Sequence, residues 1–170
     1  MRRARRQKEP LADLALRSLE KRLEIVLAGV DAFDDPETID RLHQLRIDTK
    51  RLRYAIETFA VCFTQPDQVL RELALLQEDL GAIHDLDIQI GMLRVRLATQ
   101  AGTLEVSAGE IMGSDRGPRE RSNALRGLLY AEARDPQRLG LVGLLGDTIA
   151  ERRRLFAAAR ERWQEQGITE

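Results

Sequence analysis

The stretch RLHQLRIDTKRLRY, residues 41–54, decides the fold class and points toward a function. In this stretch and just beyond it, apolar residues recur at the three- and four-residue spacing of an α-helix, namely Leu42, Leu45, Leu52, Ile56 and Phe59. At about 100° per residue, the same helix brings four side chains that can be positively charged into one narrow stripe, namely His43, Arg46, Lys50 and Arg53. We call these four residues the basic stripe. It borders the apolar face, whereas the charges of a solvated face would lie opposite to it.

Like charges at the edge of a core are costly unless something neutralises them. Glu57 could neutralise one of the cations, but three or four converging cations favour a multivalent anion such as phosphate. In this interpretation Arg46 and Arg53 bind phosphate oxygens with their planar guanidinium groups. Lys50 adds a mobile charge, and His43 donates when it is protonated. The alternative is a helix whose cations form ordinary ion pairs with neighbouring acids, and the residues alone leave both interpretations open.

Two neighbours of the basic stripe remain ambiguous. Arg51 projects away from it, and either extends the site or is simply solvated. Tyr54 lies beside His43 on the helix surface, where it either packs or contacts a ligand.

The same residues resemble the signature helix of the CHAD domain, the conserved histidine α-helical domain. The resemblance rests on HxxR at residues 43–46 followed by KRxRY at 50–54. A second block, LQEDLGAIHDLDI at 76–88, is similar to another element of that family, and the two blocks have the family's order and spacing. The resemblance covers residues 37–97 and implies an all-helical module that binds inorganic polyphosphate in a basic central pore. His84 departs from the pattern, because the family usually has Arg or Asn there.

A full CHAD domain has two related halves, each with its own basic helix, and residues 100–170 contain no second HxxR followed by cations. We therefore expect a half-length member of the family. Two copies paired about a two-fold axis would rebuild the two-half arrangement, so we also expect a homodimer.

The apolar periodicity predicts an all-α bundle of about five to six helices, in a single domain over residues 9–167 that follows a basic tail at 1–8. We expect helices over 9–32, 37–63, 67–80, 119–133 and 136–166. Residues 82–99 form either a further helix or the second half of a bent helix that begins at 67. The glycines of residues 101–118 predict a flexible loop, and no stretch has the pattern of a β-strand.

Four further charged residues are candidates for the site. Arg152 interrupts an apolar helix face, so it either pairs with an acid or points into the anion site, and Arg160 lies at the margin of that face. Asp85 and Asp87 diverge by about 200° on a helix, which argues against joint binding of one metal ion with His84 and His43. We expect Asp87 to pair with a cation of the basic stripe and to orient it.

Composition narrows the possible functions. The chain has 170 residues, a net charge of −1 and one cysteine, Cys62. The single cysteine fits a protein in a reducing compartment. The net charge close to zero argues against a nucleic-acid partner. No stretch reaches the ~20 apolar residues of a membrane span. We expect a cytoplasmic protein, with association with polyphosphate granules as an open alternative.

The leading hypothesis is a polyphosphate-binding module that is not an enzyme and needs no cofactor or metal. No phosphate-binding loop, nucleophile elbow or HExxH motif is present in the sequence. A phosphatase-like enzyme and a purely structural helical scaffold are the alternatives.

Overall fold

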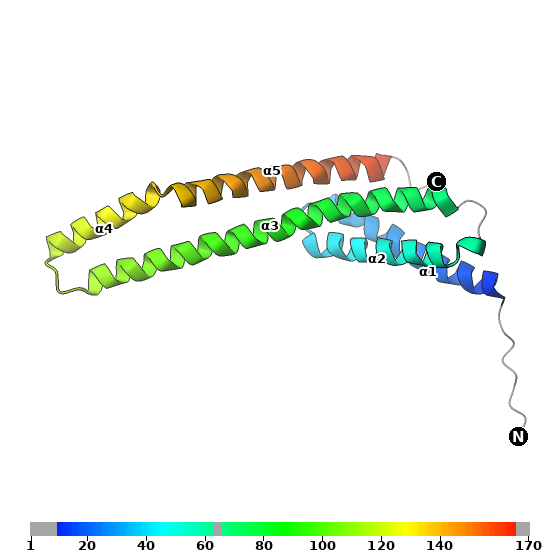
Figure 1. Ribbon diagram of the computed structural model, residues 1–170, viewed down its shortest axis with the longest axis horizontal. Helices are drawn as coiled ribbons and strands as arrows, with labels where there is room; N and C mark the ends of the chain where they lie inside the picture. Colours follow the sequence, from blue (N-terminus) through cyan, green and yellow to red (C-terminus); the bar gives the residue numbers. More distant parts are fainter. Residues whose placement is uncertain (1–9, 63–65, 166–170) are drawn as a thin grey trace, which may run out of the picture. The chain divides into compact units, whose positions relative to one another are not determined.

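The computed structural model describes residues 10–62 and 66–165, so the basic tail predicted for residues 1–8 lies outside it. The described residues form five α-helices and two short 3-10 helices (Figure 1). The α-helices are α1 (Leu11–Gly29), α2 (Ile39–Thr58), α3 (Pro66–Gly113), α4 (Pro118–Ala133) and α5 (Pro136–Glu165), and the 3-10 helices are η1 (Val30–Asp34) and η2 (Ala60–Cys62). No described residue lies in a strand, which confirms the all-α prediction.

Prolines and short polar side chains set the starts of the helices. Before α2, the Asp35 carboxylate accepts a hydrogen bond from the backbone N–H of Glu37 at 2.9 Å, which closes the turn between η1 and α2. Before α5, Asp135 makes the same kind of turn with the N–H of Gln137 at 3.0 Å. Pro136 then occupies the first helical position, where its missing N–H costs no hydrogen bond.

In the middle of the chain the structure decides between two expected alternatives and overturns one prediction. α3 runs without interruption through Gly81, so residues 67–80 and 82–99 belong to one helix. The loop predicted over 101–118 is helical as far as Gly113, and only residues 114–117 connect α3 to α4. A glycine in a helix interior costs about 1 kcal/mol relative to alanine, which packing can offset. Half-buried Leu104 and Ile111 supply such packing between the glycines.

The described residues divide into two compact units, and α3 and α5 each run through both. The first unit holds the residues up to His84 and those from Arg153 onward, and the second holds Asp85–Arg152. The single domain predicted for residues 9–167 stays a prediction.

The hydrophobic core of the first unit joins α1, η1 and α2 to the first part of α3 and the last part of α5. Phe33 and Phe156 meet at its centre with their ring centroids 5.9 Å apart. Buried Leu42, Leu45 and Leu52 fix the face of α2 that points inward. The basic stripe therefore belongs to a helix whose rotation is set by the core.

Within this unit, a carboxylate on α3 ties that helix to the last part of α5. Asp79 accepts hydrogen bonds from Arg162 Nη1 at 2.8 Å and from Trp163 Nε1 at 2.9 Å. Trp163 is buried, so Asp79 satisfies the hydrogen-bond donor of a largely buried indole. No helix in the described part of the chain contains a stretch long and apolar enough to cross a membrane.

Candidate functional site

The four residues of the basic stripe lie along α2 at the edge of the core of the first unit. His43, Arg46 and Arg53 are half-buried, and Lys50 is exposed. The neighbouring apolar residues Leu42, Leu45, Leu52 and Ile56 are buried, as the periodicity predicted. The stripe is therefore an edge-of-core row of cations on a rigid helix.

The cations of α2 differ in how they are neutralised. Off the stripe, Arg41 forms an ion pair with Asp31, and Arg51 bonds to Asp48 at 3.1 Å. On the stripe, neither Arg46 nor Lys50 has a carboxylate partner among the residues that the structure describes. Arg51 is thus a paired surface residue here. The charge available to an external anion is concentrated on the stripe.

Arg53 is neutralised only in part. Its Nε lies 3.4 Å from Oε1 of Glu57, close enough for an ion pair but without the geometry of a hydrogen bond. This buried Nε therefore has no acceptor among the described residues. Glu57 itself is nearly half exposed, so solvent screens this pair. Lys50 Nζ and the Arg53 guanidinium also lie over the Tyr54 ring, 5.7 and 5.3 Å from its centroid. Tyr54 can therefore hold both cations by cation–π attraction while their charges stay available.

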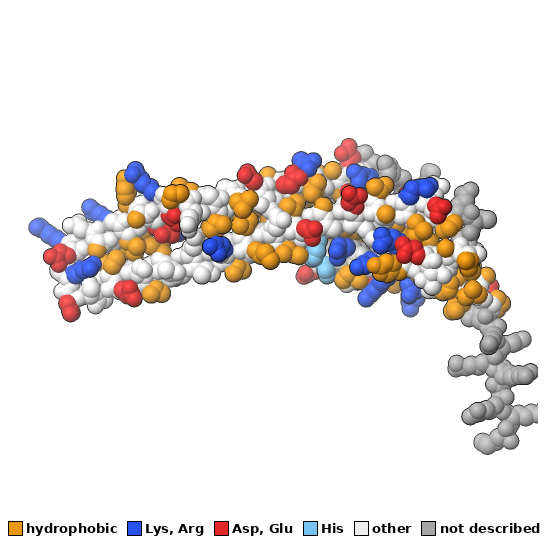
Figure 2. All heavy atoms as spheres, in the orientation of Figure 1, with side chains coloured by type: hydrophobic (Ala, Val, Ile, Leu, Met, Phe, Trp, Pro, Cys, Tyr) orange, Lys and Arg blue, Asp and Glu red, His pale blue; other side chains and the backbone are white. Residues whose placement is uncertain are grey.

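The two histidines of the chain stack against each other beside the basic stripe. The ring of His43 on α2 lies 4.7 Å from that of His84 on α3, with an angle of 32° between the ring planes. His43 Nδ1 is buried and has no hydrogen-bond partner among the described residues. On the face drawn in Figure 2, histidine atoms adjoin a group of Lys and Arg side chains. Sequence reasoning missed this stacking, although both histidines lie in the two family-like blocks.

Asp87 forms the ion pair that we expected, but with a different partner. Asp87 does not pair with a cation of the basic stripe but with Arg152 of α5, through Nε to Oδ1 and through Nη2 to Oδ2 at 3.5 Å. Both side chains are buried, with exposed fractions of 8% and 7%. Of the two alternatives for Arg152, the structure therefore has the acid pair, and a role for Arg152 in binding phosphate stays a prediction.

The remaining candidates are surface residues. Asp85 on α3 and Arg160 on α5 are both exposed, so their contributions to a site stay predictions. Within the described residues, no three His, Cys, Asp or Glu side chains are placed to hold a metal ion together. The arrangement is one of cations and imidazoles, which bind oxyanions by charge-assisted hydrogen bonds.

Comparison with known proteins gives one family. The family model of the CHAD domain matches residues 2–94, more than half of the chain, and this segment includes α2 and the part of α3 that carries His84. No curated protein and no solved structure matches the chain.

Proposed function

This chain belongs to the CHAD domain family, and from that membership we propose that it binds inorganic polyphosphate or a related polyanion through the basic stripe. One observation carries the proposal. On the single helix α2, the arginines off the stripe are paired with carboxylates, whereas Arg46 and Lys50 have no such partner among the described residues. A surface that leaves these particular cations unneutralised is suited to an anion from outside.

The position of the cations supports a strong interaction. Arg46 and Arg53 are half-buried, so water screens their charges less than it screens those of fully exposed side chains. A phosphate oxygen that accepts from a guanidinium forms a charge-assisted hydrogen bond, roughly twice as strong as a neutral one. Binding then relieves the cost of holding like charges together at the edge of a core.

The length of the basic stripe favours a chain of phosphates over a single phosphate group. From residue 43 to residue 53 the helix rises about 15 Å at 1.5 Å per residue. A linear polyanion can contact cations along the whole of this distance and release counterions from each contact. Because a single cysteine fits a reducing compartment, we place this binding in the cytoplasm.

The test is to remove two cations of the basic stripe. Arg46→Ala together with Arg53→Ala should weaken polyphosphate binding by roughly two to four orders of magnitude, at about 1.5–3 kcal/mol for each lost contact. Isothermal titration calorimetry measures this directly. Far-UV circular dichroism and a melting curve check that the double variant is folded.

A matched control removes the same charge from the same helix. Arg41→Ala together with Arg51→Ala deletes two arginines that are already paired with Asp31 and Asp48. This variant should keep polyphosphate affinity within a few-fold of the unchanged protein. Equal losses in both double variants would show that the overall charge of α2, not the basic stripe, governs binding.

A binding module and an enzyme predict different results with the same ligand. Under our proposal polyphosphate raises the melting temperature and is recovered intact. Release of inorganic phosphate that depends on added Mg²⁺ would instead indicate phosphoryl chemistry. If polyphosphate changes neither the melting temperature nor the phosphate content, the basic stripe is structural and the proposal fails.

A further inference from the structure

In the second unit, α3 carries apolar residues on two opposite sides. One side includes Ile90, Leu97 and Leu104, which are buried or half-buried within the unit. The opposite side forms a line with alternating four- and three-residue steps, the repeat of a coiled-coil seam. We call it the outer line, and it consists of Ile88, Met92, Val95, Thr99, Gly102, Val106, Gly109 and Gly113.

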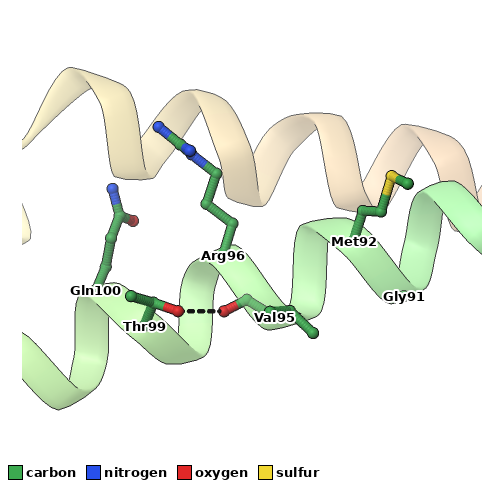
Figure 3. Close-up of a pocket in the computed structure, with 6 residues that line it drawn as sticks. All are labelled: Gly91, Met92, Val95, Arg96, Thr99 and Gln100. Atoms are coloured by element: carbon green, nitrogen blue, oxygen red, sulfur yellow. Dashed lines mark hydrogen bonds between the residues drawn. The ribbon is translucent and has the colours of Figure 1, made fainter.

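The outer line is exposed along its whole length. Met92, Val95 and Val106 have exposed fractions of 66%, 67% and 63%. Met92 and Val95 also line an open groove of about 720 Å³ on this helix (Figure 3). The one hydroxyl on the line belongs to Thr99 and donates to the carbonyl of Val95 at 3.0 Å, so the helix satisfies it internally. The line carries no charge over the length of a seam, which suits an apolar partner.

No contact among the described residues requires the glycines of the outer line. A Cβ added at Gly102, Gly109 or Gly113 would meet no atom within 4 Å, and none of the three has a positive φ. At Gly29, by contrast, an added Cβ would lie 3.1 Å from Leu45 Cδ1, so intrachain packing accounts for that glycine. Glycine is a poor choice in the interior of a helix. Small residues on an exposed apolar seam let another backbone approach closely.

We propose that the outer line is the contact surface for a second copy of this chain, with the two α3 helices packed antiparallel. The line is bulky in its first half, where Ile88, Met92 and Val95 lie, and has three glycines in its second half. Antiparallel pairing about a two-fold axis near residues 100 and 101 sets the two halves against each other. Met92 of each copy then faces Gly109 of the other, and Val95 faces Val106.

This size match is why the occupant is a copy of the chain. A surface that meets itself about a two-fold axis must be complementary to itself, and the outer line is. Parallel pairing would set glycine against glycine and leave Val106 as the one large side chain in contact along the second half. On α5, the outward line through Leu139, Gly143 and Gly146 has a single large residue and ends at Arg153, so it offers a shorter apolar contact.

The first test changes an exposed valine to a charged residue. Val95→Glu should raise the dimer dissociation constant roughly tenfold or more, because a carboxylate would be buried at the contact. Analytical ultracentrifugation over a dilution series measures this constant, and circular dichroism confirms the fold. Val142→Glu on α5 is the matched control, because Val142 is also exposed but lies off the outer line. It should leave the dimer unchanged.

The second test fixes the direction of the helices. With Cys62 replaced by serine, Met92→Cys and Gly109→Cys are prepared as separate variants. A mixture of the two should form disulfide-linked dimers under mild oxidation, whereas neither variant alone should do so. Crosslinking of Met92→Cys with itself would indicate parallel pairing and overturn the proposal.

Three other outcomes would also overturn it. The unchanged protein could be a monomer at every concentration, which would rule out a second copy of the chain as the partner of the outer line. The dimer could survive Val95→Glu, or it could be lost on Val142→Glu. Gly109→Leu provides a last check, since it should weaken the dimer by filling the space that Met92 of the second copy needs.

Discussion

Replacing Asp87 by alanine should destabilise the protein strongly, because it leaves a buried arginine without its counter-charge. Only 7% of the Arg152 side chain and 8% of the Asp87 side chain are exposed. Breaking a buried ion pair by removing one partner costs about 3–5 kcal/mol. In a protein of this size, 1 kcal/mol corresponds to roughly 2–4 °C, so the melting temperature should fall by roughly 6–20 °C.

The assay is a double-mutant cycle, in which thermal and urea unfolding measure the stability of each variant. Asp87→Ala and Arg152→Ala should each cost several kcal/mol, whereas Asp87→Leu with Arg152→Met should recover most of the loss, since an apolar pair can replace a buried ion pair. Arg153→Ala is the control, because Arg153 is exposed and its removal should change stability by about 0.5 kcal/mol or less.

The outcome also separates two roles for Asp87. If it serves only Arg152, the folded Asp87→Ala protein should bind polyphosphate as tightly as the unchanged chain does. A variant that melts normally but loses polyphosphate affinity would refute this reasoning, and it would restore the orienting role that the sequence suggested. If the loss of stability in the double variant Asp87→Ala with Arg152→Ala equals the sum of the two single losses, the two side chains are not coupled.

Three further predictions concern other parts of the molecule. Asp79→Ala should lower stability by about 1–3 kcal/mol, since it strands the buried Nε1 of Trp163, and it should shift the fluorescence of this single tryptophan. Gly29→Ala should destabilise by about 1 kcal/mol in urea unfolding, because its Cβ would press on Leu45, and unchanged or raised stability would mean that Leu45 can move aside. The affinity for polyphosphate should fall linearly with salt on logarithmic axes, and a flat dependence would argue against ionic binding.

The sequence determined the features that lie within single helices. The 3.6-residue period alone placed Leu42, Leu45 and Leu52 on the buried side of α2 and the basic stripe beside them, as the structure confirms. Proline with a preceding aspartate located the start of α5. These signals are local, because side chains three or four residues apart on a helix share a face whatever else the chain does.

Glycine content was a misleading local signal. Gly102 and Gly109 suggested a loop, yet α3 continues through both. The cost of glycine in a helix is small compared with what a long helix gains by packing its inner side, so tertiary contacts decided the outcome.

Only the tertiary structure decided which residues of different helices meet. Asp87 and Arg152 are separated by 65 positions in the sequence, and Asp79 and Trp163 by 84. Periodicity shows that Arg152 interrupts an apolar face, but it does not show which acid from another helix faces it. That choice depends on how each helix is rotated and shifted against its neighbour, which is set by the packing of the side chains at their contact.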